Sequence, residues 1–313
     1  MKYKYLFLIL LIVSCGGGGS SSMPQTPMQN TNNAPFFTNT ISEIEIDELQ
    51  TEVTTISADD LDDDVLRYTL SGNDPSYFSI SGTGAITFNQ LISYEVKNEF
   101  SITIEVTDNI ESVSQPLKIY LLKVCSESLL GFEVCLEEEN LSITYDRQAD
   151  YPTWQDWDGD CQNNRHEVLI NEHIDDDAVN HPLVLSSDTC YVNSGKWFDP
   201  YDNVYYFNSS EVQIDHVVAL YEAHKSGAWS FPAARKLKFA NNIDFDDLLI
   251  AVGGSSNSRK GSFDPASWMP SNVNYSCNYL EKWLNVKAEF RLSLDESERV
   301  AIESLYQTNN CSF

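Results

Sequence analysis

Short segments in which apolar and polar residues alternate fill residues 34–124. They are rich in Val, Ile, Thr, Tyr and Phe, and Gly, Asn and Asp separate them, as in RYTLSG (67–72), YFSISGTGAITF (77–88) and FSITIEVTDN (100–109). Alternation with period two places every second side chain on one face of a strand. Closely spaced turn residues between such strands are typical of a sandwich. The pattern predicts an all-β sandwich over residues 34–124.

Beyond residue 142 the pattern changes to a mixture of strands and helices. Val212 to Asp215 alternates like a strand with His216 at its exit, and 249–252 is a short apolar run followed by a Gly/Ser turn. Residues 278–290 have helical periodicity, and Ser293 and Asp295 offer a cap for a helix over 295–307. We therefore expect a multi-domain chain, with an α+β domain over 143–313 and an acidic connector over 125–142.

The first fifteen residues, MKYKYLFLILLIVSC, place two lysines before an apolar run that is short for a membrane span. This is typical of an export signal. Residues 12–15 resemble the lipobox of bacterial lipoproteins, which implies lipidation of Cys15 and anchoring to the cell envelope, at the outer membrane. An ordinary secretory signal is the alternative. Residues 16–33 begin with GGGGSSS and are expected to form a flexible tether.

Six cysteines remain when Cys15 is set aside, an even number that suggests disulfides in an exported chain. Pairing of nearest neighbours is the prediction among fifteen possible connectivities. It joins Cys125 to Cys135, Cys161 to Cys190 and Cys277 to Cys311.

The formal net charge of -28 repels polyanions unless a local site reverses it. The segment from Lys225 to Lys260 contains six basic and three acidic residues, which gives it a local net charge of +3. We expect this segment to form a basic rim in which Arg259 and Lys260 bind phosphate.

Several motifs in residues 34–124 resemble a cadherin-like repeat, namely APFF (34–37), ADDLD (58–62), GTGAITF (82–88), SYE (93–95) and VTD (106–108). The resemblance implies that Asp60, Asp62 and Asp108 share a calcium site and that Glu48 and Glu95 form half of another. Clustered oxygen ligands suit calcium. Only one repeat is present and the acidic linker of that family is missing, so an acidic, solvated loop is the alternative.

Asp215, His216 and Asn257 are residue types that suit phosphodiester cleavage. A neutral imidazole can act as general base toward water. A carboxylate and an amide oxygen can hold Mg²⁺ or another divalent cation, which stabilises charge in the transition state. Asp215 and His216 point to opposite faces of a strand, so one can bind the metal while the other faces the water.

Five ordered blocks between residues 143 and 310 resemble the secreted HNH endonuclease family related to the GmrSD nuclease domain. They are YDRQADYPTWQDWDGDCQNNRHEVLI (145–170), GKWFDPYDN (195–203), IDHVVALYEAHKSGAW (214–229), RKLKFANNIDFDDLLIAVGGSSNSRKGSFDPASWMP (235–270) and CNYLEKWLNVKAEF (277–290). The resemblance implies a ββα-metal (HNH, His-Me finger) core, with His216 as general base, Asp215 and Asn257 as metal ligands, and DNA as substrate. Asp247 or Leu248 falls near the middle Asn of the motif, so the residue that orients His216 is not identified.

The block around Arg165 has two interpretations. We expect Arg165 to bind a phosphate at the catalytic centre, with Glu167 or Asp160 supporting the metal. The alternative is an internal salt bridge of Arg165 in a turn that a disulfide holds before a helix. Asp158 and Asp160 can also bind a structural ion, although such a turn is often only a turn. The other four histidines are expected at the surface: His166, His173, His181 and His224.

These features give a leading hypothesis and an alternative. The first is a surface-anchored, metal-dependent endonuclease acting on DNA, with RNA left open as substrate and no obligate protein partner evident. The second is a calcium-binding adhesion lipoprotein whose C-terminal domain is a catalytically disabled nuclease fold. A metal hydrolase for other phosphodiesters or glycans is a weaker third class, because the spacing singles out no carboxylate pair.

Overall fold

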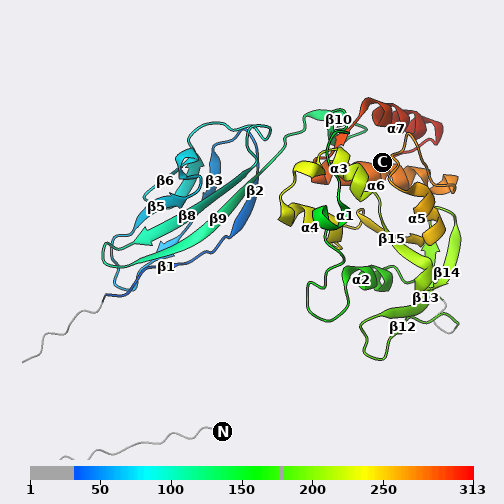
Figure 1. The fold of residues 1–313 in the computed structure, drawn as a ribbon, viewed down its shortest axis with the longest axis horizontal. Coiled ribbons are helices and arrows are strands. Elements are labelled where there is room, and N and C mark those ends of the chain that lie inside the picture. The colour runs from blue at the N-terminus through cyan, green and yellow to red at the C-terminus, as the bar shows by residue number, and fades with distance from the viewer. Residues whose placement is uncertain (1–31, 177–179) are drawn as a thin grey trace, which may run out of the picture.

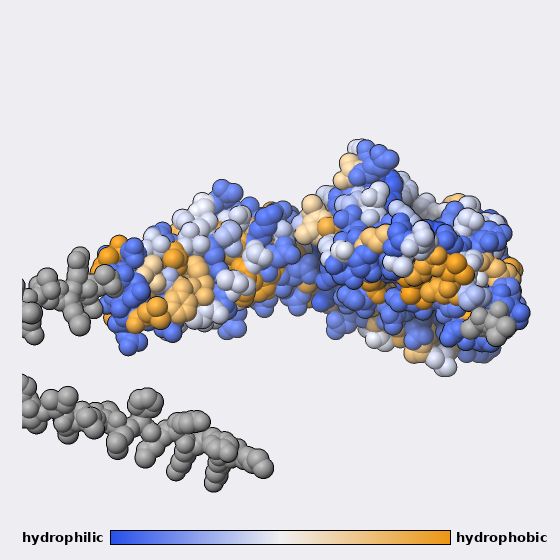
Figure 2. Space-filling model, turned by 90° about the horizontal axis from the view of Figure 1, so that it is seen from below, coloured by the Kyte–Doolittle hydropathy of each residue, from blue (hydrophilic) through white to orange (hydrophobic). Residues whose placement is uncertain are grey.

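A computed structural model describes residues 32–176 and 180–313. The predicted signal, Cys15 and most of the predicted tether lie outside these residues. The described chain forms two lobes (Figure 1). Figure 2 shows an elongated N-terminal lobe placed end to end with a larger C-terminal lobe.

The N-terminal lobe is a sandwich of a four-stranded and a three-stranded sheet. The first has the order β2-β9-β8-β5, in which only β2 and β9 are parallel, and the second has the order β3-β7-β6. A short pair, β1 and β4, completes the lobe. The strands are β1 (Phe36–Phe37), β2 (Glu43–Asp47), β3 (Glu52–Thr55), β4 (Ala58–Asp59), β5 (Arg67–Gly72), β6 (Phe78–Ile80), β7 (Ala85–Phe88), β8 (Glu99–Thr107) and β9 (Ser112–Leu122), with a 3₁₀ turn, η1 (Pro75–Tyr77).

The alternation along β8 explains how this lobe holds together. Phe100, Ile102, Ile104 and Val106 are fully buried, whereas the residues between them are half-buried. In the sandwich core they lie in one cluster with buried residues of β3, β6, β7 and β9. Burial of each such side chain contributes about 1.5–3 kcal/mol to folding.

The predicted connector belongs to the C-terminal lobe. It forms a hairpin of β10 (Glu127–Leu129) and β11 (Phe132–Leu136), and β11 pairs in parallel with β17 (Ser293–Leu294). Leu129 and Val134 are part of the C-terminal core. The sequence did not predict β10 and β11, because their alternating segments are short and because β17, the partner of β11, lies far along the chain.

The described part of the C-terminal lobe surrounds its core with helices and three small sheets, of which β10-β11-β17 is the first. Its other strands are β12 (Val184–Leu185), β13 (Val192–Asp199), β14 (Val204–Asn208), β15 (Val212–His216) and β16 (Leu249–Gly253), and they form the sheets β12-β13-β14 and β15-β16. Its helices are α1 (Arg147–Asp150), α2 (Asn164–Asn171), α3 (Leu220–Lys225), α4 (Ala233–Asn241), α5 (Gly254–Lys260), α6 (Ser276–Phe290) and α7 (Glu296–Thr308), with 3₁₀ turns η2 (Ser209–Glu211), η3 (Ala228–Ser230) and η4 (Val273–Tyr275).

The predicted C-terminal helices are confirmed. In α6, Tyr279, Leu280, Trp283 and Leu284 are fully buried at helical spacing. The side chain of Asp295 caps α7 by accepting a hydrogen bond from the backbone N–H of Glu298.

The β15–β16 pair and α5 form one unit near the centre of the lobe. The strands are antiparallel, with His216 opposite Leu249, and their connection contains α3 and α4. Helix α5 starts directly after β16 and packs on both strands. Gly253 is needed at this junction because a Cβ there would lie 2.3 Å from the hydroxyl oxygen of Tyr206.

The lobes meet through a few polar contacts. Tyr94 and Ser230 share a hydrogen bond between hydroxyls at 2.7 Å, and Arg235 lies 3.5 Å from Glu45.

The three predicted disulfides are confirmed. Within the part of the chain that the structure describes, no helix combines the length and hydrophobicity needed to span a bilayer.

Candidate functional site

His216 ends β15 with its side chain turned toward the end of α4. Its Nε2 lies 2.9 Å from the carbonyl oxygen of Ala240. The last carbonyls of a helix have no partner within the helix, so this oxygen is free to accept. Since a carbonyl cannot donate, Nε2 carries the hydrogen and Nδ1 has a free lone pair in the neutral ring. Ala240 is therefore the group that orients His216, which the sequence left unidentified.

Two aromatic rings fix the plane of the imidazole. Trp154 stacks on His216 with ring centres 5.6 Å apart and planes 5° from parallel, and Phe239 lies 6.2 Å away. Only 7% of His216 is exposed. Burial lowers the pKa of His216 to about 3, so the ring is neutral at pH 7.

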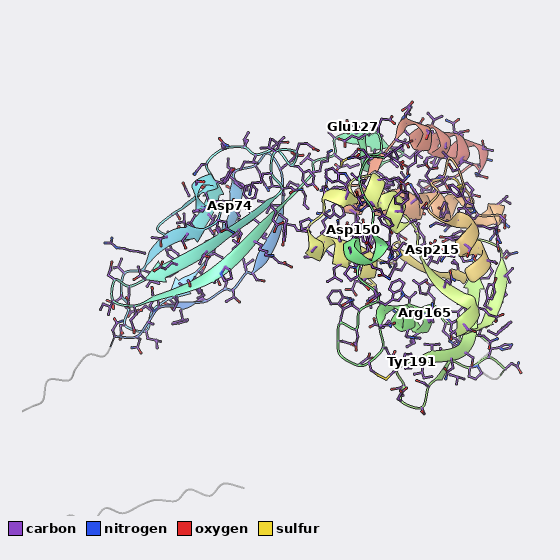
Figure 3. All side chains as sticks on the ribbon, in the orientation of Figure 1. Asp74, Glu127, Asp150, Arg165, Tyr191 and Asp215 are labelled. Carbon is purple, nitrogen blue, oxygen red and sulfur yellow. A yellow bond between two sulfur atoms is a disulfide. The ribbon has the colours of Figure 1, made fainter. Side chains whose placement is uncertain are left out.

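Asp215 points to the opposite face of β15, as predicted, but it meets a lysine there. Nζ of Lys260 lies 3.0 Å from the Asp215 carboxylate and 2.9 Å from the carbonyl oxygen of His216. The hydroxyl of Tyr201 donates to Oδ2 of Asp215 at 2.8 Å. All three side chains are buried. Burial raises the pKa of Asp215, and the Lys260 ammonium opposes that rise. Figure 3 labels Asp215 within this lobe.

The expected metal site therefore forms only in part. Asn257 reaches β15, where its Nδ2 donates to Oε1 of Gln213 at 2.9 Å, two residues before Asp215. Asp215 already has Lys260 as counter-charge, so as it stands it does not fit as a direct ligand of a cation. Asn257 is half-buried and its amide oxygen can serve one.

The residues expected to bind phosphate are engaged elsewhere. Lys260 is fully buried, and Arg259 is exposed but pairs with Asp202. Arg165 donates to the carbonyl oxygens of Ser209 and Val212, both at 2.9 Å, which attaches α2 to the start of β15. Arg165 thus makes an internal contact, but with backbone carbonyls, and it forms no salt bridge among the described residues, so the predicted alternative is correct only in placing it inside the fold. Its role as a phosphate ligand stays a prediction.

The predicted basic rim is mostly paired. Five of its six cations lie within 4.0 Å of carboxylates, and only Lys238 has none of the ion pairs found among the described residues. His224, expected at the surface, is buried, and its Nε2 donates to the carbonyl oxygen of Thr144. Counting charges along the sequence could not reveal these pairings, because most of the acidic partners come from other segments.

The sandwich keeps an acidic end beside residues 32 and 33. Asp62 accepts from the backbone N–H of Asn33 at 2.7 Å, and Asp108 accepts from Nδ2 of Asn32 at 2.8 Å. Oδ2 of Asp60 is buried and has no hydrogen-bond partner. One carboxylate oxygen from each of Asp60, Asp62 and Asp64 lies within 4.8 Å of the others, a spacing that a cation can bridge. This group contains Asp64 and not Asp108, the third predicted ligand.

The second predicted calcium half-site is occupied by other contacts. Glu48 accepts from the backbone N–H of Tyr94 at 2.7 Å and of Val124 at 3.0 Å. Glu95 pairs with Lys123 at 3.0 Å. These carboxylates fix the end of the sandwich next to the connector.

No known family profile matches the chain. An uncharacterized secreted protein of Arthroderma benhamiae is 37% identical over 158 residues, which are 50% of this chain and 72% of that protein. Two crystal structures of cadherin fragments also match part of the chain, each with a low TM-score. Human protocadherin-24 EC1-2 has 25% identity and a TM-score of 0.27, and covers 29% of this chain and 44% of its own. For chicken VE-cadherin EC1-2 the values are 24%, 0.26, 29% and 51%. This chain thus spans about half the length of each fragment or less.

Proposed function

This chain belongs to the family of the uncharacterized secreted protein of Arthroderma benhamiae, and from this relationship and the site around His216 we propose that it is an exported hydrolase of phosphodiester bonds. DNA is the proposed substrate. We further propose that Cys15 carries a lipid that anchors the chain to the cell envelope.

The observation that carries the proposal is the tautomer of His216. The Ala240 carbonyl holds the hydrogen on Nε2, so Nδ1 is the atom that can take a proton from water. The resemblance to HNH endonucleases also supports His216 as general base; in the chain, β15 is followed by α3, α4, β16 and α5.

A buried imidazole with a pKa of about 3 is a weak base before substrate arrives. A phosphodiester anion beside the ring favours the charged form and raises the pKa of His216 toward the range useful for base catalysis. The stacked Trp154 keeps the ring in place while the proton moves.

A divalent cation such as Mg²⁺ is part of the proposal, with Asn257 as its ligand from the protein. Such an ion would stabilise negative charge on the phosphate and on the leaving oxygen. Magnesium often keeps several waters and is held by one or two carboxylates together with substrate phosphate, so here the phosphate would supply the negative charge that Asn257 lacks. No step is assigned to Asp215, because Lys260 already neutralises it.

The test is cleavage of supercoiled plasmid by the purified chain with Mg²⁺ or with a chelator. We expect cleavage by the wild type, a loss of about a hundredfold or more in His216→Ala, and no change in the matched control His181→Ala. Single-stranded RNA in a parallel reaction separates the two nucleic acids. Absence of cleavage with every divalent cation tried would refute the proposal.

A binding role is the second candidate, and the orphaned Oδ2 of Asp60 favours it. In this case calcium at Asp60, Asp62 and Asp108 stiffens the sandwich for contact with a partner, and the buried Lys260–Asp215 pair marks a disabled catalytic centre. Calcium-dependent stabilisation of the sandwich without any plasmid cleavage would support this candidate over the first.

A further inference from the structure

The segment that covers His216 begins at helix α1 and follows α4. Helix α1 lies beside α4 (Figure 1), because Asp150 at its end pairs with Lys236 at 2.8 Å. Four residues after Asp150, Trp154 stacks on His216, which the carbonyl at the end of α4 holds in place. The chain from α1 to Trp154 therefore runs along α4 from Lys236 toward His216. A side chain of α1 that extends along this segment approaches the imidazole.

Arg147, the first residue of α1, has such a side chain. Its guanidinium donates a hydrogen bond to the backbone carbonyl of Tyr151, three residues before Trp154. The guanidinium therefore lies along the chain between α1 and the indole that covers His216. Burial is the main cause of the low pKa of His216, and the positive charge of Arg147 lowers this pKa further, in agreement with that placement.

Arg147 is one of the few cations of the C-terminal lobe without an acidic partner. Ten of the thirteen lysines and arginines in this lobe lie within 4.0 Å of a carboxylate. Among the described residues, Arg147, Arg165 and Lys238 have no such ion pair. Arg165 is held by two backbone carbonyls, and Lys238 lines a groove between the lobes that does not include His216. Of these three cations, Arg147 is the one available beside the proposed general base.

The two acidic residues closest to Arg147 in the chain have other partners. Asp146 caps α1 by accepting hydrogen bonds from two backbone N–H groups, and Asp150 pairs with Lys236. Arg147 itself is exposed. A guanidinium has five N–H donors, and within the described part of the chain only the carbonyl of Tyr151 accepts from this one. Arg147 therefore keeps both its charge and most of its donors for a ligand.

Building on the proposed hydrolase function, we propose that Arg147 binds the substrate phosphate that lies next to His216. A guanidinium suits this role because its planar N–H groups can bind two phosphate oxygens at once. The two residues that the sequence predicted for phosphate binding, Arg259 and Lys260, are paired with carboxylates. Arg147 supplies the cation that these residues do not.

A phosphate bound to Arg147 would also change the protonation of His216. In the free chain, burial and then the positive charge of Arg147 oppose protonation of the imidazole. A phosphodiester at Arg147 neutralises this charge and places an anion near the ring, so the pKa of His216 rises toward the range useful for a general base. Binding of the substrate and activation of the base would then depend on the same guanidinium.

The salt dependence of DNA binding by the full chain tests this role without relying on cleavage. A fluorescent DNA duplex is titrated with protein in the presence of a chelator, between 50 and 200 mM salt. We expect Arg147→Met to bind about tenfold or more weakly at 50 mM salt. The slope of log affinity against log salt should become shallower by about 0.9, the value for one lost phosphate contact. Arg147→Lys keeps the charge and should keep the slope. Lys238→Met, which also removes a cation without an acidic partner, is the matched control and should change neither value.

The slope separates a phosphate contact from a structural role, because loss of folded protein lowers the apparent affinity without changing the slope. Arg147→Gln repeats the measurement if Arg147→Met fails to fold, since its amide can still donate to the Tyr151 carbonyl. Plasmid cleavage by the wild type is measured in parallel. Cleavage by the wild type together with an unchanged slope in the folded variant would overturn the role of Arg147 and leave the proposed hydrolase standing. A shallower slope in the variant without cleavage by the wild type would support the phosphate contact and refute the hydrolase. Absence of DNA binding by the wild type would overturn both.

Discussion

The buried pair of Lys260 and Asp215 makes a strong prediction about stability. Lys260→Met leaves the Asp215 carboxylate without counter-charge in a site where the two side chains are 0% and 5% exposed. Removing one partner of a buried ion pair costs about 3–5 kcal/mol. The carbonyl of His216 also loses its donor, which adds about 1 kcal/mol or more. We expect Lys260→Met to destabilise the C-terminal lobe by about 4–6 kcal/mol.

The double variant Asp215→Asn/Lys260→Met should recover most of this loss. Asparagine carries no charge and can still accept the hydrogen bond from Tyr201. Replacement of a whole buried pair by neutral residues is often close to neutral in stability. The interaction energy from the double-mutant cycle should therefore be about 2 kcal/mol or more.

Urea unfolding followed by tryptophan fluorescence measures these changes in the C-terminal lobe alone, since all six tryptophans follow residue 150. Lys238→Met is the matched control, because Lys238 lies on the exposed side of α4, and it should shift stability by less than about 0.5 kcal/mol. A cost below about 1 kcal/mol for Lys260→Met, or additive effects in the double variant, would refute the assignment of Lys260 as the counter-charge of Asp215.

Three further variants test His216, Arg165 and Glu172, a residue after α2 whose carboxylate accepts a hydrogen bond from the backbone N–H of Ala251 in β16. The pKa of His216 is about 3 in the folded chain and about 6.5 in the unfolded chain, so stability falls as pH drops below 6.5, by about 2 kcal/mol at pH 5. Urea titrations at pH 7 and pH 5 should show this loss in the wild type and not in His216→Ala. An equal loss in the variant would contradict the low pKa of His216. Burial raises the pKa of Glu172 to about 7, so the stability that the protonated carboxyl contributes is present at acid pH and is lost as pH rises from about 4.5 to 7. Glu172→Gln should therefore be more stable than the wild type at pH 8, by up to about 3 kcal/mol, and equally stable at pH 4. Arg165→Met should cost about 1–3 kcal/mol of stability, because two carbonyls lose their donor; unchanged stability with weaker DNA binding would instead indicate a phosphate contact.

The sequence predicted local features well because local rules determine them. The alternation in β8, the cap at Asp295 and the opposite orientations of Asp215 and His216 follow from the periods of strands and helices and from capping chemistry. Nearest-neighbour pairing also gave the three disulfides.

The contacts that define the site were not predictable in the same way. The group that orients His216 is a backbone carbonyl at Ala240, and every residue has such a carbonyl. Lys260 was detectable in principle: it follows Asn257 by three residues, so both lie on the face of α5 that packs on β15. Because Lys260 lies so close to Asp215, its charge neutralises a residue of the site instead of binding a ligand.

The state of His216 is the claim on which the proposed function depends, and ¹⁵N NMR of histidine-labelled protein tests it most directly. The chain has five histidines, and the spectrum of His216→Ala identifies the signal of His216 by its loss. We predict a neutral ring at pH 7 with the hydrogen on Nε2 and an unprotonated Nδ1, unchanged down to pH 5. A hydrogen on Nδ1, or protonation of the ring near pH 6.5, would contradict the account.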